Sequence, residues 1–227
     1  MMRLAWLWAA AASLAADPLA EFEKALDAQP DSMQIGSEYR MAVIRSKEHD
    51  RCIKFLGDLA AKHPKAPNLH LNHGFAYVDK IPVAGSITQV LLANTALGHF
   101  GKSIEAQPTW IAHYTRGNAY LFWPKIFKRM PLAIADLEAA MKMQKADKKR
   151  SYHIRNYISL GDGYWKNEEP DKAKATWQEG LKEFPGNEQL TVRLAKSPAE
   201  MDALIVEVYD PNKRVDTNLA ELWKQQP

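Results

Sequence analysis

A relaxed phosphate-loop pattern is the first group of residues that could do chemistry. Ala96–Ser103 reads ALGHFGKS and ends in the Gly-Lys-Ser triplet of such loops. A phosphate loop needs a preceding strand and free backbone N–H groups that open a helix. Here Ala96, Phe100 and Ser103 instead recur at the spacing of helix-packing positions. The pattern therefore favours a helix interior over a nucleotide site.

Two histidines could bind a metal, because His70 and His73 stand three residues apart and would share one helix face. Such a pair needs further ligands to hold a transition metal. No acidic residue stands at a spacing that completes the set, since Asp79 lies about two helical turns beyond His73. We expect no metal site, and we interpret both residues and His113 as packing residues between helices.

Catalytic signatures are missing from the sequence. The single cysteine, Cys52, can form neither an internal disulfide nor a thiolate zinc site, and we expect it to be buried. There is no Gly-x-Ser-x-Gly elbow and no His-Glu-x-x-His helix, and the carboxylates are scattered. The sequence therefore predicts no enzyme activity and no cofactor.

Composition and charge describe an ordinary folded chain. The 227 residues are 46% hydrophobic and 25% charged, with a formal net charge of +3. The one dense basic run, Lys142–Arg150, is typical of a solvated helix end, where positive charge complements the helix dipole. Because acidic residues match the basic ones elsewhere, we expect no nucleic-acid partner.

The N-terminus has the pattern of a secretory signal peptide over residues 1–16. A short positive start at Arg3 precedes an apolar run and small residues, with cleavage after Ala15 or Ala16. A permanent membrane anchor is the alternative, which the shortness of the apolar run disfavours. We therefore expect an exported protein, periplasmic or extracellular.

The elements that would position any site are repeats. Tyr157–Pro185 contains two helical apolar stripes on either side of an Asn-Glu-Glu-Pro turn. Gly161 and Ala173 would let two antiparallel helices approach, and Trp177 would fill the space between neighbouring units. This unit resembles a tetratricopeptide repeat (TPR).

The same pattern recurs upstream with less fidelity. Pro30 and Pro64 are 34 residues apart, which is the period of the TPR family. Glycines recur in the first half of each unit, at Gly36, Gly74 and Gly117. The resemblance implies an all-α, right-handed α-solenoid of helix-turn-helix repeats, with about four and a half units over residues 17–186.

Capping helices are expected after the last repeat, over residues 187–227. Three short helices are predicted at Asn187–Ala195, Pro198–Tyr209 and Val215–Lys224, with Ser-Pro and Asp-Pro breaks between them. The alternation within Leu204–Tyr209 also fits a strand, but no partner strand is evident. We expect the apolar residues of these helices to cover the open face of the last repeat.

TPR arrays bind their ligands on the concave surface formed by the first helices of successive units. Carried over to this chain, the resemblance implies a largely apolar and aromatic groove. Its expected residues are Leu71, Phe75, Val78, Ile111, Tyr114, Asn118, Leu121, Arg155, Ile158 and Trp165. Such a groove favours an amphipathic helix, an extended apolar segment or a small hydrophobic molecule.

Two insertions interrupt the turn between the helices in neighbouring units, at Lys80–Asn94 and Phe122–Pro131. Insertions into repeats map to loops on one face, so we expect the two to lie side by side. The apolar residues expected to form a lid or a partner patch are Ile81, Val83, Trp123, Ile126 and Phe127. The alternative is that each insertion only lengthens a helix pair.

The sequence thus favours a non-catalytic exported TPR-like protein that binds a partner protein or peptide. By analogy alone, it would be an accessory to an envelope assembly or transport process. A carrier of a small hydrophobic ligand is the alternative, and peripheral membrane association stays open. The identity of the partner, the pathway and the oligomeric state stay open as well.

Overall fold

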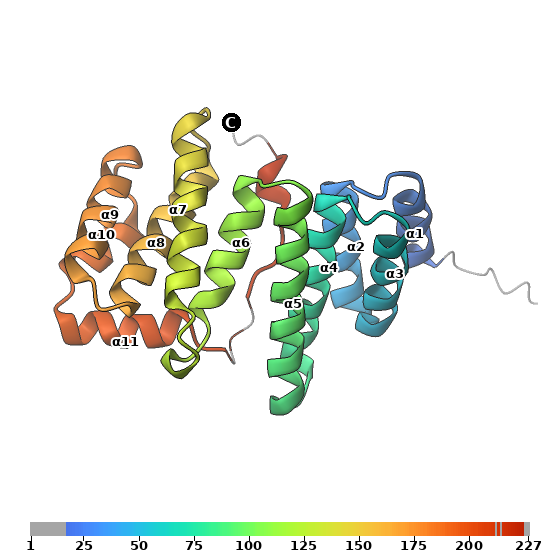
Figure 1. Cartoon of the computed structure of the whole chain (residues 1–227), viewed down its shortest axis with the longest axis horizontal. Helices are drawn as coiled ribbons and strands as arrows, with labels where there is room; N and C mark the ends of the chain where they lie inside the picture. The colour runs from blue at the N-terminus through green and yellow to red at the C-terminus, as the bar shows by residue number, and fades with distance from the viewer. Residues whose placement is uncertain (1–16, 212, 214, 225–227) are drawn as a thin grey trace, which may run out of the picture.

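The computed structural model describes residues 17–211, 213 and 215–224, which form a row of antiparallel helix pairs (Figure 1). The signal peptide expected over residues 1–16 lies outside the described residues. The α-helices are α1 (Pro18–Ala28), α2 (Met33–Ser46), α3 (His49–Lys62), α4 (Pro67–Lys80), α5 (Ser86–Ala106), α6 (Trp110–Leu121), α7 (Met130–Ala146), α8 (Ile154–Lys166), α9 (Pro170–Glu183), α10 (Glu188–Ala195) and α11 (Pro198–Val208). Among the described residues there is no strand, and no helix combines the length and hydropathy needed to cross a membrane.

Local sequence signals define where the helices begin. Proline stands in the first turn of α1, α4, α7, α9 and α11, where no intrahelical hydrogen bond is lost. The side chain of Ser32 accepts a hydrogen bond from the Ile35 amide at 3.3 Å, and Asn187 accepts one from the Leu190 amide at 3.1 Å. These caps explain why the helices are short and sharply bounded.

Glycine permits the close approach of the two helices in each unit. A Cβ atom built on Gly161 would lie 2.1 Å from Nε1 of Trp177, and one on Gly74 would lie 2.4 Å from a ring carbon of Phe100. Gly36 and Gly117 also face tight neighbours on adjacent helices. Gly74, Gly117 and Gly161 therefore occupy equivalent positions between the two helices of a unit, which confirms the predicted helix-turn-helix repeats. Gly36 of α2 differs, because it faces Asn72 of α4 in the next unit.

Three apolar clusters run along the row of helices. The first joins α1 to α4 and includes Cys52, which is 1% exposed as expected and whose pKa burial raises to about 12. The second joins α7 to α11 around the fully buried Trp177. The third lies between them and includes Leu219, a residue of the C-terminal segment. The C-terminus is therefore part of the core of the solenoid.

The C-terminal region agrees with two of its three predicted helices. α10 and α11 match the expected ranges, and Leu204 to Val208 are helical rather than extended. The helix predicted at Val215–Lys224 is wrong, because residues 215–219 have no regular secondary structure and only Ala220–Leu222 form a single 3-10 turn. In Figure 1 this segment, coloured red, runs back from α11 across the middle of the molecule.

The two insertions fold differently from each other. Most of Lys80–Asn94 becomes the first turns of α5, which lengthens the helix pair, as one of the two alternatives expected. Phe122–Pro131 remains a connection with one 3-10 turn, Lys125–Phe127. Arg129 donates a hydrogen bond to Asn94 at 3.1 Å. This contact confirms that the two insertions lie side by side.

Candidate functional site

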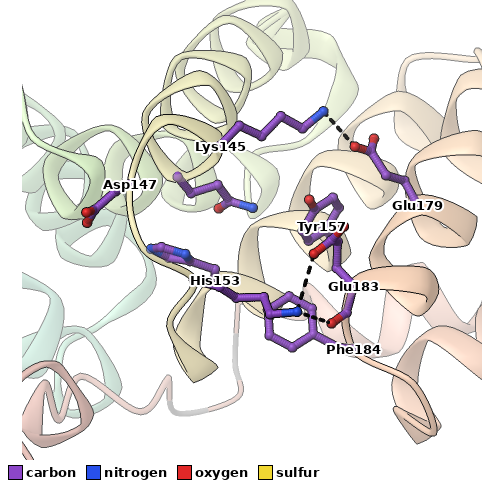
Figure 2. Close-up of a pocket in the computed structure, with 9 residues that line it drawn as sticks. Lys145, Asp147, His153, Tyr157, Glu179, Glu183 and Phe184 are labelled. Carbon is purple, nitrogen blue, oxygen red and sulfur yellow. Dashed lines mark hydrogen bonds and ion pairs between the residues drawn. The ribbon is translucent and has the colours of Figure 1, made fainter.

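A pocket of about 310 Å³ lies between the end of α7 and α9 (Figure 2). Two lysines of the basic run, Lys145 and Lys149, line it, and both are paired with acidic residues. Lys145 lies 2.6 Å from Glu179, and Lys149 lies 3.4 Å from Glu183. Because acidic residues of α9 neutralise the run, this pocket offers no concentrated positive surface for a polyanion.

A larger cavity, of about 580 Å³, is lined by α4, α5 and α6. Six of the predicted groove residues line it: Phe75, Val78, Ile111, Tyr114, Asn118 and Arg155. Ile81, Trp123 and Phe127 from the insertions line it as well. The cavity thus brings together predicted groove residues of α4, α6 and α8 with residues of both insertions.

The C-terminal segment forms one wall of this cavity, which the sequence did not indicate. Leu219 and Leu222 line it, and Leu219 packs among Leu71, Phe75 and Trp123. Leu219 is only 8% exposed. The groove expected to be open is therefore partly filled by the protein's own chain.

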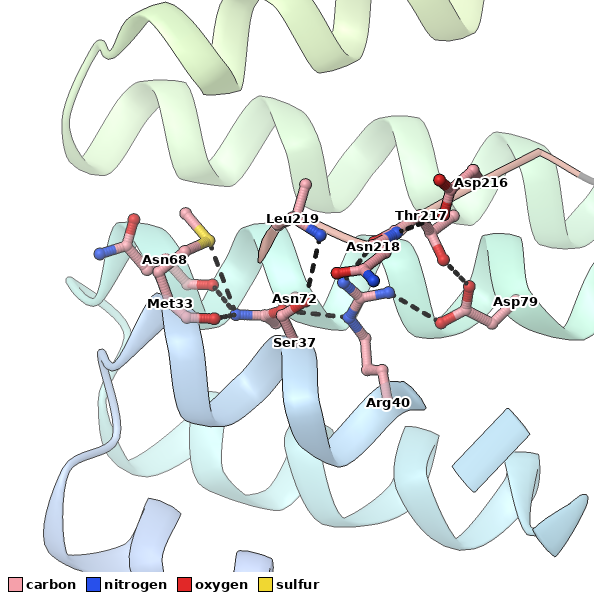
Figure 3. Close-up of polar contacts among 10 residues, drawn as sticks. All are labelled: Met33, Ser37, Arg40, Asn68, Asn72, Asp79, Asp216, Thr217, Asn218 and Leu219. Atoms are coloured by element: carbon pink, nitrogen blue, oxygen red, sulfur yellow. Dashed lines mark hydrogen bonds and ion pairs between the residues drawn. The ribbon is translucent and has the colours of Figure 1, made fainter. Parts of the chain in front are cut away.

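Polar groups of α2 and α4 hold the segment (Figure 3). Arg40 donates from Nη2 to the carbonyl oxygen of Thr217 at 3.0 Å, and the Leu219 amide donates to Oγ of Ser37 at 3.3 Å. The hydroxyl of Thr217 donates to Oδ1 of Asp79. Two of these contacts bind backbone groups of a non-helical segment, and hydrogen bonds to the backbone are also a means by which grooves bind peptides.

Arg40 is the central residue of this arrangement. Its side chain is fully buried, lies 2.9 Å from the Asp79 carboxylate, and donates from Nε to Asn72 at 3.0 Å. Its guanidinium stands 4.7 Å from the centroid of the Phe75 ring. Sequence reasoning missed this residue. The available signal was a charged residue between Tyr39 and Met41 on the inner face of a helix.

Solved structures with the same architecture are TPR proteins. One is TTC0263, a thermophilic TPR protein of Thermus thermophilus, with a TM-score of 0.56 and 20% identity over 78% of this chain and 87% of that one. The fold is that of a tetratricopeptide-repeat solenoid. YrrB, described as a TPR protein with an unusual peptide-binding site, matches with a TM-score of 0.52 and 15% identity over 82% of this chain and 91% of its own.

A third TPR-like neighbour is the MamA RS-1 ArsTM double mutant, with a TM-score of 0.53 and 20% identity over 78% of this chain and 94% of that one. No protein-family model matches the chain, and no curated protein matches it. The structural similarity shows the fold, but at identities of 15% to 20% it transfers no ligand from these proteins to this TPR solenoid.

Four predicted groove residues belong to the core of the TPR solenoid rather than to the cavity. Leu71 is fully buried in the third apolar cluster. Leu121 is fully buried, and Ile158 is 9% exposed within the second apolar cluster. The indole of Trp165 donates to Asp202 of α11 at 2.8 Å and stacks on Trp177. These placements correct the prediction, because α11 covers the concave face of the last unit.

A buried ion pair fixes α10 and α11 on that face. Arg193 of α10 donates from Nε to Asp162 of α8 at 2.7 Å, and the hydroxyl of Tyr209 donates to the same carboxylate at 2.9 Å. Asp162 is fully buried. The last unit of the TPR solenoid is thus closed by polar contacts as well as by apolar packing.

The five apolar insertion residues do not form one patch. Trp123 is 8% exposed, and the Arg129 guanidinium stands 3.8 Å from its ring centroid. Ile81 is half-buried at the cavity, and Phe127 is half-exposed at its edge. Val83 and Ile126 are exposed and do not line the cavity. The insertions therefore provide part of the cavity wall together with a separate exposed surface.

The chemistry-bearing residues of the sequence pack between helices of the TPR solenoid. His73 lies with its ring centroid 3.9 Å from that of His99 and is 4% exposed. Burial and the neighbouring His99 lower the pKa of His73 to about 3. No group of metal-binding residues occurs among the residues that the structure describes. The Gly-Lys-Ser triplet lies inside α5, so its amides do not form a phosphate loop.

Proposed function

We propose that this chain is a non-catalytic scaffold that binds a partner protein or peptide in the concave groove between α4 and α6. The observation that carries the proposal is the C-terminal segment, which lines this groove with Leu219 and Leu222 and whose backbone is bonded by Arg40 and Ser37 of the neighbouring α2. A site that binds one non-helical chain through its backbone has the chemistry to bind another. The apolar walls at Phe75 and Ile111 would accept the apolar side chains of such a partner.

We place this scaffold outside the cytoplasm, as an accessory to an envelope assembly or transport process. The signal-peptide pattern of residues 1–16 supports export, and the process rests on analogy. Val83, Ile87 and Ile126 are more than half exposed, at 67%, 83% and 83%, and they offer a surface for peripheral contact with a membrane or partner.

A carrier of a small hydrophobic molecule is the second candidate function. The observation that favours it is the cavity itself, whose 580 Å³ falls in the range of ligand pockets. Aromatic side chains from three places along the chain, Trp110, Tyr114 and Trp123, contribute to its wall. A molecule bound there would lie beneath the C-terminal segment.

Native mass spectrometry separates the two functions. The mature chain, from Asp17 onward, is purified gently from its own source together with an Ile111→Glu variant, which places a charge in the cavity wall. A protein-sized or peptide-sized mass increment that the Ile111→Glu variant loses supports the scaffold. A small, defined adduct that it loses supports the carrier.

The matched control is Val206→Glu, because Val206 is 73% exposed on α11 and does not line the cavity. The control must keep any increment that the groove binds. Increments that both variants retain, or that both lose, would contradict binding in the groove.

A further inference from the structure

We propose that the groove recognises a non-helical segment in which a hydroxyl side chain is followed two residues later by leucine, and that Val215–Trp223 is its internal competitor. This inference rests on the proposed scaffold function and names the chemistry of the partner. The internal segment provides the pattern, because Thr217 and Leu219 are its two buried residues, at 4% and 8% exposure.

Two hydrogen bonds to the backbone fix the position of the segment in the groove. Any chain with the same backbone conformation could form them. The carbonyl of Thr217 accepts from Arg40, and the amide of Leu219 donates to Ser37. These bonds hold the two backbone groups on either side of Asn218, whose own side chain is exposed. The groove therefore selects for the side chains of Thr217 and Leu219, which flank Asn218.

The selectivity comes from one polar and one apolar subsite. Asp79 accepts a hydrogen bond from the Thr217 hydroxyl, so a residue without a donor would leave that buried carboxylate oxygen unpaired. Leu219 enters an apolar subsite formed by Leu71, Phe75 and Trp123. A polar or charged residue at this position would be buried without a partner.

A weaker contact extends the pattern beyond leucine. Glu221 lies 2.6 Å from Arg155, but the two side chains are 29% and 50% exposed. Exposed ion pairs of this kind contribute little net stability, so an acidic residue here favours binding without determining it. Threonine or serine and leucine carry the recognition.

The receptor groups are held in place independently of the segment. Arg40 is bound by Asn72 and Asp79 and packs on Phe75, all residues of α4. Asn72 in turn donates to the carbonyl of Asn68 at 3.1 Å within the same helix. A groove organised in this way needs no rearrangement to accept a second chain of the same pattern.

The segment packs on the third apolar cluster but is only partly buried. Apart from Thr217 and Leu219, the residues of Val215–Lys224 are exposed or half-buried. Its tether keeps it at an effective concentration on the order of 1 mM, so a partner must compete with it. The apparent affinity for the partner is then reduced in proportion to the fraction of molecules whose groove is open.

The test titrates the full chain with a fluorescently labelled peptide, VDTNLAELWK, which is the sequence of residues 215–224. The full chain carries Leu219→Asp, which weakens the internal segment and leaves the groove intact. Fluorescence anisotropy should show at least about tenfold tighter binding to this variant than to the wild type. The control Val206→Asp should bind like the wild type, and a peptide with aspartate in place of its leucine should not bind.

Circular dichroism and thermal melting establish that the variant is folded. If Leu219→Asp does not fold, Thr217→Val provides the same test, because valine keeps the shape of threonine and removes the donor to Asp79. It should bind the peptide about threefold tighter than the wild type. A folded variant that binds the peptide no tighter than the wild type overturns the proposal.

The result also distinguishes this inference from the proposed function. If the folded variants bind no tighter, while the mass increment in native spectrometry still depends on Ile111, the groove binds partners of another pattern. In that case only the inference fails. If the increment is also independent of Ile111, the groove is not a partner site and both proposals fail.

Discussion

At the scale of single residues, the packing of Gly161 against Trp177 decides how closely two helices approach. Trp177 is fully buried, and a Cβ atom at position 161 would lie 2.1 Å from its Nε1 and 2.4 Å from Cδ1. The indole cannot move away without disturbing the second apolar cluster, in which it is packed on several sides. Position 161 thus requires glycine because a side chain would collide with Trp177, and not because of its backbone conformation.

Gly161→Ala should therefore lower the free energy of unfolding by about 3 kcal/mol, because the added methyl group overpacks the interface. Gly98→Ala is the matched control, since a Cβ atom there meets nothing within 4 Å and the position is inside α5. It should raise stability by about 0.5 to 1 kcal/mol through helix propensity. Urea unfolding of both variants measures these changes, and equal effects would contradict the packing account.

His73 makes the fold sensitive to acid. Its pKa is lowered to about 3 by burial and by the neighbouring His99, whereas in the unfolded chain it is near 6.5. His70, His99 and Lys102 face it from α4 and α5, and none of them can compensate a positive charge. The unfolded state therefore binds a proton that the folded state does not bind between these two pH values.

Stability should be fully present above pH 6.5 and fall as the pH drops toward about 3, by about 1.4 kcal/mol per pH unit for this one group. The measurement is the free energy of unfolding in urea across this range. His73→Gln should reduce the dependence of the unfolding free energy on pH by about 1.4 kcal/mol per pH unit, which is the contribution of one proton. This holds whatever the substitution does to stability at neutral pH. An unchanged slope in this variant would show that His73 is not the responsible group.

At the scale of elements, the second insertion combines a buried and an exposed aromatic residue. Trp123 is 8% exposed beneath Arg129, whereas Phe127 is 50% exposed and meets Trp123 edge to face, with ring centroids 5.2 Å apart. Both residues line the cavity. The insertion is therefore anchored by Trp123 and presents Phe127 at the edge of the site.

Trp123→Ala should lower the free energy of unfolding by about 3 kcal/mol, as expected for a large buried aromatic residue. Phe127→Ala should cost less than about 1 kcal/mol and should instead weaken binding of whatever occupies the cavity. Thermal melts and peptide titration of both variants separate the two effects. A large loss of stability in Phe127→Ala with unchanged binding would mean that the insertion only packs the solenoid.

The C-terminal segment shows why one predicted helix does not form. Val215, Leu219 and Leu222 recur at helical spacing, which predicted a helix. In the structure Asp216 accepts from the Asn218 amide at 2.9 Å, and Asn218 accepts from the Ala220 amide at 2.9 Å. These local side-chain bonds compete with helical ones, and the segment gains its contacts from a distant part of the chain. No pattern within the segment reveals those contacts.

At the scale of the whole molecule, the repeats could be predicted from the sequence because each unit repeats the same local packing. Gly74, Gly117 and Gly161 mark equivalent close approaches, and they are visible as a recurring pattern in the sequence. Six residues that line the cavity, from α4, α6 and α8, were named from that period. The closure of the groove could not be predicted, because it depends on contacts between residues far apart, such as Arg40 with Thr217.

The central claim is that the concave groove is a peptide-binding site occupied by the chain's own C-terminal segment. Hydrogen exchange measured by mass spectrometry, with and without saturating isotopically labelled VDTNLAELWK, tests it most directly. The account predicts that the tethered Leu219 region loses protection on addition of the peptide, while α4 and α6 keep theirs. Unchanged protection of the tethered segment at saturating peptide would contradict the account.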